Sequence, residues 1–245
     1  MRIVCWYSCG AASAVATKLA ISQHGKENIV IARCIVREEH PDNDRFAKEC
    51  EEWFDHPITN LVNEKFDGSI YSVFAKRKYM SGIAGAPCTQ ELKKRVREEF
   101  QHPNDVHVFG YTAEEQDRYD HFIDANNVRC EAPLIDRGLE HKDCLAMIKN
   151  AGIELPEMYK LGYKHNNCIG CVKSTGAGYW NKIRKDFPEE FQKASIASRL
   201  YGARLIRVDC ERCFLDELPE GIGNYLDEPE IQCGIFCHMA EGEYK

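Results

Sequence analysis

The stretch IVCWYSCGAAS, residues 3–13, decides the fold, because it joins a short strand pattern to a helix through a loop of small residues. Residues 3–7 are apolar and rich in β-formers, and an alanine-rich helical pattern covers residues 11–23. In open α/β sheets, ligands lie at the carboxyl ends of strands, where small residues let backbone N–H groups approach a phosphate. A tight turn built only for packing explains the loop equally well. The candidate phosphate-binding residues are Ser8, Cys9, Gly10, Ala11, Ala12 and Ser13.

The alternation of strand and helix continues through the first half of the chain. Further strand patterns cover residues 28–34, 57–61, 106–109 and 128–133. Helical patterns cover residues 42–54, 91–100, 113–126 and 140–150. This order predicts an α/β fold with an open parallel sheet that helices cover on both faces.

The pattern changes near residue 153. Two helical patterns, over residues 176–185 and 187–200, lead into a tail rich in cysteine, glycine and acids. We therefore expect two domains: a sheet domain over residues 1–153 and a helical, cysteine-rich lobe over residues 154–245.

The composition is that of an ordinary globular chain, with 245 residues of which 44% are hydrophobic and 29% charged. It excludes a disordered chain, a collagen and a coiled coil. No apolar run approaches the ~20 residues that a bilayer span needs, and no long apolar signal region follows Met1. We expect a cytoplasmic protein with no membrane contact. There, 13 cysteines favour metal ligands and reactive thiols over disulfides.

The charge is unevenly distributed along the chain. Residues 160–208 contain ten lysines and arginines against three acids, a net charge of +7 in a chain whose net charge is −7. A basic segment in an acidic protein suggests an anion-binding face, and a nucleic acid is a polyanion that such a face would bind. The alternative is a helical surface that is simply exposed to solvent. On the charge distribution alone, this alternative is favoured over an anion-binding face.

The loop at residues 8–13 resembles the SGGxDS pyrophosphate loop of PP-loop adenine-nucleotide enzymes, and it differs from that pattern at Cys9, Ala11 and Ala12. Other segments occur in the same order as in the phosphoadenosine-phosphosulfate (PAPS) reductase family. They are EHPDNDRF at 39–46, GYTAEEQDR at 110–118, PLID at 133–136, LP at 155–156, YKLGY at 159–163 and CIGC at 168–171. The chain therefore resembles this family over nearly its whole length, especially the short members common in phages. The resemblance implies a five-stranded parallel sheet of the nucleotide α-hydrolase type, with ATP or adenosine phosphosulfate as the ligand.

Polar residues follow two of the strand patterns. Just past the second strand, Glu38 or Glu39 is placed to accept from a ribose hydroxyl, and Glu39 is our candidate, although a solvent-facing acid would look the same. Glu115 and Arg118 are three residues apart and share a helix face. Arg118 could hold a phosphate or sulfate bidentately, and Glu115 is a candidate catalytic residue. A surface ion pair is the alternative for these two.

Three cysteines are candidate ligands of an iron–sulfur cluster. Cys168 and Cys171 form a C-x2-C pair, which is typical of zinc sites, iron–sulfur clusters and redox dithiols. Cys88 is the third candidate, by resemblance to assimilatory adenosine-phosphosulfate reductases, which use a Cys-Cys pair before a basic helix and a later C-x2-C. A [4Fe-4S] cluster with three cysteines leaves one iron free to hold a sulfide or substrate atom, as in PP-loop enzymes that insert sulfur into tRNA bases. Alternatively, Cys88 is a buried apolar residue and the C-x2-C pair is a small zinc or dithiol element.

A second set of cysteines has the paired spacing of a zinc knuckle or ribbon, and it comprises Cys210, Cys213, Cys233 and Cys237. A zinc ion would supply folding free energy to an acidic tail with little apolar content. By resemblance, Cys233 is also a candidate catalytic residue, because PAPS reductases end in a Cys-Gly-Leu-His motif whose cysteine attacks the sulfate. We prefer zinc, since four ligands occur together. The cysteines expected to pack in the core are Cys5, Cys34, Cys50, Cys130 and Cys144.

These patterns predict an adenine-nucleotide-binding, iron–sulfur-dependent enzyme that resembles the PAPS reductase family. In the favoured chemistry, ATP adenylates a nucleic acid bound by residues 160–208, and a sulfur donor supplies the sulfur. In the alternative, a thiol reductant such as thioredoxin supports reduction of PAPS or adenosine phosphosulfate, with Cys233 as the nucleophile. A third hypothesis is a non-catalytic nucleotide-binding module, which Ala12 in place of the usual Asp favours.

Overall fold

The computed structural model describes residues 1–82, 85–126, 128–208 and 211–228. The chain forms two compact units, each assembled from segments that are far apart in sequence. The sheet unit contains residues 1–35, 40–62 and 96–166, and the helical unit contains residues 36–39, 63–95 and 167–245. These units differ from the two contiguous domains expected from the sequence. The short segment 36–39 pairs with the C-terminal part of the chain, because the Ile169 N–H donates to the Glu38 carbonyl at 2.8 Å.

The sheet unit is built on five strands in the order β3-β2-β1-β4-β5. The strands are β1 (Ile3–Trp6), β2 (Ile29–Cys34), β3 (Ile58–Leu61), β4 (Val106–Val108) and β5 (Arg129–Glu131). All neighbouring strands are parallel, with Ile3 of β1 opposite both Ile29 and Val106. The predicted α/β fold with an open, five-stranded parallel sheet is confirmed. Continuous apolar runs form its central strands because both faces are buried.

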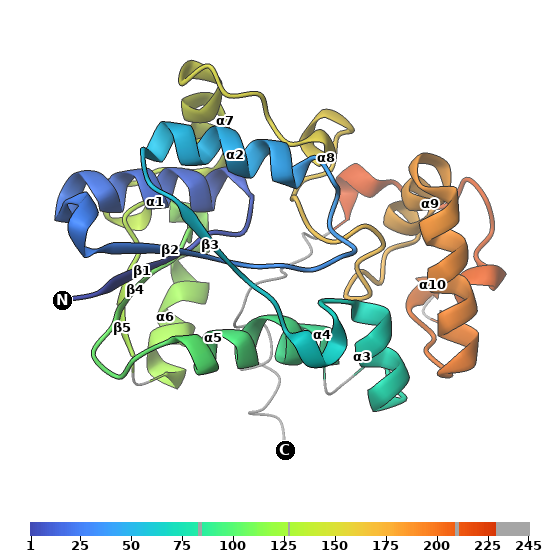
Figure 1. The fold of residues 1–245 in the computed structure, drawn as a ribbon. Coiled ribbons are helices and arrows are strands. Elements are labelled where there is room, and N and C mark those ends of the chain that lie inside the picture. The colour runs from blue at the N-terminus through green and yellow to red at the C-terminus, as the bar shows by residue number, and fades with distance from the viewer. Residues whose placement is uncertain (83–84, 127, 209–210, 229–245) are drawn as a thin grey trace. The chain divides into compact units, whose positions relative to one another are not determined.

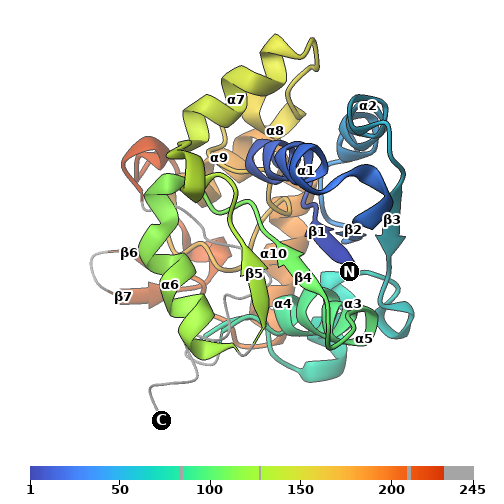
Figure 2. The same cartoon turned by 90° about the vertical axis from the view of Figure 1, so that its left-hand side faces the viewer.

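Helices cover both faces of this sheet (Figures 1 and 2). On one face lie α1 (Ala11–His24), α2 (Asn43–Phe54) and α7 (His141–Asn150), and on the other lie α5 (Arg95–Phe100) and α6 (Gln116–Ala125). Shorter helical turns complete the unit: η1 (Lys26–Asn28), η4 (Ala113–Glu115), η5 (Ile135–Arg137) and α8 (Glu157–Lys160). The small residues of α1 let that helix pack closely on the strands and on α7.

The expected core cysteines lie in these layers. Cys5, Cys50 and Cys144 have no exposed surface, Cys34 is buried, and Cys130 is half-buried. Burial raises the pKa of the thiols of Cys5, Cys50, Cys130 and Cys144 to about 12. They are therefore neutral thiols that contribute packing, as predicted.

A buried histidine, His107, occupies the middle of strand β4. The indole N–H of Trp6 donates to Nδ1 of His107 at 3.0 Å, and Phe109 stacks on the imidazole ring. An indole N–H can only donate, so Nδ1 accepts and the proton of the neutral ring lies on Nε2. Burial lowers the pKa of His107, the charge of Arg97 lowers it further, and Asp105 opposes them.

This histidine should make stability depend on pH. Below its ordinary pKa of 6.5, the unfolded chain binds a proton that folded His107 resists, so the free energy of unfolding should fall as the pH drops from 7 to 5. We expect the fall to be smaller in His107→Asn, which keeps an acceptor for Trp6, when urea unfolding is compared at both pH values. His56→Asn, at a half-buried position in the sheet unit, is the control. An unchanged pH slope in His107→Asn would contradict this assignment.

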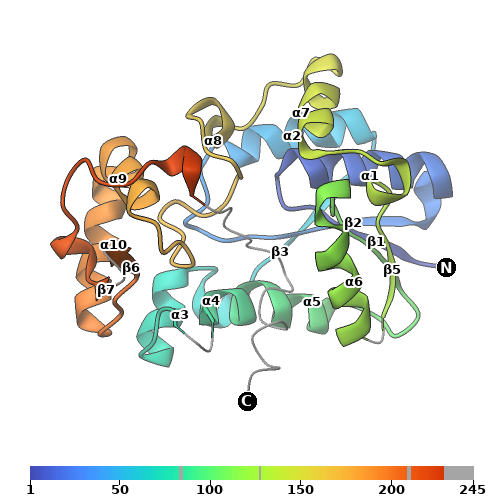
Figure 3. The same cartoon turned by 180° about the vertical axis from the view of Figure 1, so that it is seen from behind.

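The helical unit combines three groups of elements. One is η2 (Glu64–Phe66) with α3 (Ile70–Arg77), followed by α4 (Pro87–Thr89) and the π-helical turn η3 (Gln90–Lys94), which runs on into α5. The second is the pair α9 (Ala177–Asp186) and α10 (Pro188–Leu200), which pack on each other around the buried Trp180 (Figure 3). The third is an antiparallel hairpin, β6 (Ile206–Val208) and β7 (Glu211–Cys213), followed by η6 (Leu215–Glu217) and η7 (Tyr225–Asp227). None of the helices in the described residues combines the length and apolar character that a membrane span requires.

Candidate functional site

The strand order places a topological switch point at the carboxyl end of β1. The chain continues from β1 to β2 on one side of it, whereas β4 lies on the other side. In open parallel sheets, the connections that leave two such strands diverge and open a crevice at which ligands bind. The loop at residues 7–10 follows β1, and Gly110 follows β4 closely, so both lie at this switch point.

Gly110 allows the connection after β4 to lie against the start of α1. A Cβ atom at this position would be 2.6 Å from the backbone nitrogen of Ser13 and 2.8 Å from the carbonyl carbon of Ala12. Both are backbone atoms at the start of a helix, so neither can move aside cheaply. Only glycine therefore fits here, and it brings two candidate segments, residues 8–13 and 110–118, into contact.

One residue of the loop has a left-handed backbone conformation. Cys9 has φ +57°, in the left-handed region, at a position where the SGGxDS pattern has glycine. This conformation costs a residue with a side chain roughly 1–2 kcal/mol, so surrounding contacts must hold it. The Cys9 carbonyl accepts from the side-chain amide of Asn166 at 2.7 Å, and its thiol lies 3.7 Å from the Asn43 carbonyl oxygen.

The two serines of the loop bond mainly to the loop itself. The Ser13 hydroxyl donates to the Gly10 carbonyl at 2.9 Å and accepts from the backbone N–H of Ser8 at 3.1 Å. The exposed Ser8 hydroxyl also lies 3.1 Å from the Ser13 hydroxyl oxygen. Ser13 therefore shapes the loop, and Ser8 is the hydroxyl that remains accessible.

The N-terminus of α1 is suited to an anion. The first N–H groups of any helix lack intrahelical acceptors, and the helix dipole adds positive potential there. No acidic side chain lies in the first turn of α1, and Gly10, its N-cap residue, has no side chain that could cap it. The Ala11 N–H is an exception, since it donates to the Tyr159 hydroxyl at 3.4 Å.

Two residues that were not predicted from the sequence, Tyr159 and Asn166, make hydrogen bonds to the backbone of this loop. The Tyr159 hydroxyl accepts from the backbone N–H groups of Ala11 and Asn166, and burial raises the pKa of this phenol to about 12. The Asn166 amide donates to both Cys9 and the Oδ1 atom of Asn43, which is almost fully buried. Within the described residues, Oδ1 of Asn166 is buried without a hydrogen-bond partner. Tyr159 lies in a segment that carries the family resemblance, but no local pattern indicates Asn166, because its partners are 157 and 123 residues away.

Glu115 and Arg118 pair with each other beyond β4. The Arg118 guanidinium donates to Oε1 of Glu115 and lies over the Tyr111 ring, 5.2 Å from its centroid. Oε2 of Glu115 accepts from the Thr112 N–H at 3.2 Å, in a capping box that starts the helix. Both side chains remain about a quarter exposed, so Arg118 can still reach a ligand.

Glu38 and Glu39 belong to the helical unit and have local partners there. The Glu38 carboxylate accepts from the Ser69 hydroxyl at 2.6 Å and the Ile70 N–H at 2.9 Å, so it caps α3. The Glu39 carboxylate is buried and pairs with Lys93 at 3.3 Å. Glu39 is therefore not the solvent-facing acid of the alternative interpretation.

The three candidate cluster cysteines all lie in the helical unit. Cys168 and Cys171 are buried on a turn in which Gly170 has φ +68°, and Cys88 is half-buried at the start of a helix after Pro87. Among the described residues, no three His, Cys, Asp or Glu side chains are grouped to hold a single metal ion. A cubane cluster separates its cysteine sulfurs by up to ~7 Å, much farther than one ion does, so the cluster remains a prediction.

The predicted zinc site falls largely outside the described residues. Cys213 is half-buried on β7, and burial raises the pKa of its thiol. Cys210, Cys233 and Cys237 lie outside the described residues. The roles of Cys233 as zinc ligand and as nucleophile therefore both stay predictions.

No protein-family model matches this chain, and no curated protein matches it either. The functional assignment accordingly depends on the loop, the switch point and the cysteines.

Proposed function

We propose that the protein is an adenine-nucleotide-binding, iron–sulfur-dependent enzyme that transfers sulfur to a nucleic acid at the expense of ATP. The observation that carries the nucleotide half of this proposal is the loop at residues 8–13. It follows β1 at the switch point, touches the β4 connection at Gly110 and leads into a helix N-terminus whose N-cap residue, Gly10, has no side chain to cap it. This combination suits the phosphates of a nucleotide.

The surrounding residues supply the rest of the nucleotide site. The phosphates lie on the N–H groups at the start of α1, and Arg118 binds their negative charge. Oδ1 of Asn166, which has no hydrogen-bond partner in the described part of the chain, accepts from a donor on the ligand, such as a ribose hydroxyl or the adenine amino group. In the reaction, ATP adenylates a nucleic-acid base or backbone with release of pyrophosphate, and sulfur from a donor then displaces AMP.

Cys88, Cys168 and Cys171 would hold the cluster. The buried C-x2-C turn fits such a role, since two thiols and a glycine with positive φ can wrap a compact inorganic group. A [4Fe-4S] cluster with three protein ligands supplies an open iron for the sulfur.

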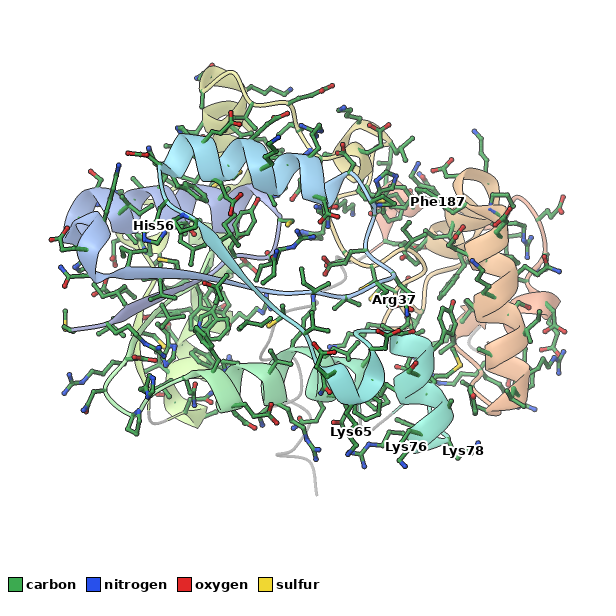
Figure 4. The ribbon with its side chains drawn as sticks, viewed as in Figure 1. Arg37, His56, Lys65, Lys76, Lys78 and Phe187 are labelled. Atoms are coloured by element: carbon green, nitrogen blue, oxygen red, sulfur yellow. The ribbon has the colours of Figure 1, made fainter. Side chains whose placement is uncertain are left out.

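Part of the basic segment 160–208 remains open to a polyanion. Its members with an ion pair among the described residues include Lys160, Lys182, Lys193 and Arg199. Exposed members without an ion pair among the described residues are Lys185, Arg204 and Arg207. The side chains of Lys65, Lys76 and Lys78 also extend away from the ribbon of the helical unit (Figure 4). Oligonucleotide binding should therefore weaken as salt rises, because bound phosphates release counterions.

The alternative function is reduction of an adenylyl sulfate to sulfite with a thiol reductant. The resemblance to PAPS reductases and the acidic overall charge favour it. The two enzymes differ in their products, since the reductase forms sulfite and the sulfurtransferase forms pyrophosphate and a thiolated nucleic acid. A non-catalytic module would bind nucleotide without turning it over, with or without reductant.

Anaerobic purification with metal analysis tests the cofactors. We expect a brown protein with about four iron and one zinc per chain. Cys171→Ser should lose the iron and keep the zinc, whereas Cys213→Ser should lose the zinc and expose the tail to protease. Cys144→Ser, in a core position, should keep both metals. Full iron content in Cys171→Ser would remove the C-x2-C pair from the cluster, and full zinc content in Cys213→Ser would end the knuckle hypothesis.

Arg118→Ala tests the nucleotide site. A charge-assisted contact is worth about 1.5–3 kcal/mol, so the affinity for ATP or adenosine phosphosulfate should fall more than tenfold by calorimetry. Arg129→Ala, an exposed arginine on β5, is the matched control and should bind normally. Equal affinity in Arg118→Ala and the wild type would place Arg118 outside the site.

A further inference from the structure

The segment at residues 215–228, here called the strap, lies along one face of α9. Gly178, Asn181 and Arg184 follow one another at three-residue intervals and share this face. The Asn181 amide donates to the carbonyls of Pro219 and Ile222 at 3.0 and 2.9 Å. The Arg184 guanidinium donates to the Leu218 carbonyl at 2.8 Å. The helix therefore holds the strap by its main chain.

At the start of α9 the strap ends in a carboxylate. Oε1 of Glu228 accepts from the Gly178 N–H at 2.6 Å, and Oε2 accepts from the Tyr179 N–H at 3.0 Å. A negative charge at this position also complements the helix dipole. The backbones are close, because a Cβ atom on Gly178 would be 2.5 Å from the Tyr225 nitrogen, and one on Gly223 would overlap the Gly178 nitrogen. The strap thus fixes the first turn of α9.

The same turn of α9 holds the C-x2-C loop. The Tyr179 hydroxyl accepts from the Cys171 N–H at 2.7 Å, and the Trp180 indole donates to the Ser174 carbonyl at 3.0 Å. The Tyr179 ring also contacts the ring of Tyr225 in the strap, with centroids 5.9 Å apart. Tyr179 therefore bonds to Glu228 through its backbone and to Cys171 through its side chain.

From this geometry we infer that Glu228 and Tyr179 are positioning residues for the C-x2-C loop. Glu228 holds the first turn of α9 in place through two backbone N–H groups. The hydroxyl of Tyr179, which lies in that turn, then holds the Cys171 N–H in place. Without the carboxylate, two N–H groups at the helix start lose their acceptors, the turn frays and the Tyr179 hydroxyl moves off the loop. The functional importance of the loop rests on the proposed function, but the mechanical coupling does not.

Amide hydrogen exchange of the full-length, metal-free protein tests the coupling residue by residue. Glu228→Gln should accelerate exchange about tenfold or more at Gly178, Tyr179 and Cys171, because a carboxylate with two N–H donors becomes a neutral amide with one acceptor. Tyr179→Phe should accelerate exchange at Cys171 alone, since it removes only the hydroxyl. Glu220→Gln is the matched control, because this exposed acid in the same strap takes no part in the hydrogen bonds to α9 described above. It should change none of these amides.

The two variants separate coupling from general destabilisation. Amides of Val15 in α1 should exchange at the wild-type rate in both variants, and alkylation of Cys168 and Cys171 should be faster than in the wild type. The inference is overturned if Glu228→Gln exposes Gly178 and Tyr179 but leaves Cys171 protected. It is also overturned if Tyr179→Phe leaves Cys171 protected, a result that can be read even if Glu228→Gln unfolds. Iron content, measured separately, reports on the proposed function, so the two failures are distinguishable.

Discussion

Gly110→Ala should weaken nucleotide binding at least tenfold and lower the free energy of unfolding by about 1–3 kcal/mol. The added Cβ would be 2.6 Å from the Ser13 nitrogen, so the connection after β4 and the first turn of α1 must separate. That movement displaces the N–H groups expected to hold the phosphates and the helix that carries Arg118. A shift of even 1 Å in groups that bind a ligand together is costly. Calorimetry with ATP and urea unfolding measure the two effects.

Gly138→Ala is the control for this substitution. Gly138 has φ +63°, but a Cβ atom there would meet nothing within 4 Å. The control should therefore cost only about 1–2 kcal/mol of backbone strain and leave nucleotide affinity unchanged. Wild-type affinity in Gly110→Ala would mean that the contact between the β4 connection and α1 does not shape the site.

Asn166→Ala should destabilise the sheet unit by about 2–4 kcal/mol, because two buried acceptors lose their donor. These acceptors are the Cys9 carbonyl and Oδ1 of Asn43, each 2.7 Å from the Asn166 amide. The left-handed backbone at Cys9 would lose one of the contacts that hold it, so nucleotide affinity should fall as well. Urea unfolding followed by calorimetry on the folded fraction gives both quantities.

Asn28→Ala is the matched control, since the Asn28 amide also makes two hydrogen bonds, to the His24 carbonyl and to Glu27. These bonds are only partly shielded from water, and their loss should cost about 1 kcal/mol or less. A similar cost for the two substitutions would contradict a special role for Asn166 beneath the loop.

Much of the fold could be predicted because local periodicity determines it. The strand at residues 3–7 and the helix at 11–23 became β1 and α1, and the pattern at 42–54 became α2. The helix α3 was missed, although buried Ile70, Val73 and Phe74 have helical spacing. Its segment lies between two clear elements and is shorter than most amphipathic helices.

The site was predictable only where it is local in sequence. The loop at residues 8–13 and the Glu115–Arg118 pair follow strands directly, and strand ends of parallel sheets share one edge. Glu115 and Arg118 form the ion pair that the alternative interpretation expected, and both side chains are also partly exposed. Asn166, in contrast, acts through contacts that only the folded chain creates. Spacing alone could not reveal it.

The interleaving of the two units has a consequence for how the protein is made. The chain passes from one unit to the other five times, after residues 35, 39, 62, 95 and 166. All residues up to 166 must therefore leave the ribosome before the sheet unit has all its segments, and residues 63–95 must wait for residues from 167 onward to find their partners. Domains usually fold one after another as they emerge during synthesis. This chain must instead produce segments of both units before either unit is complete, so a product that stops before residue 166 contains neither unit whole.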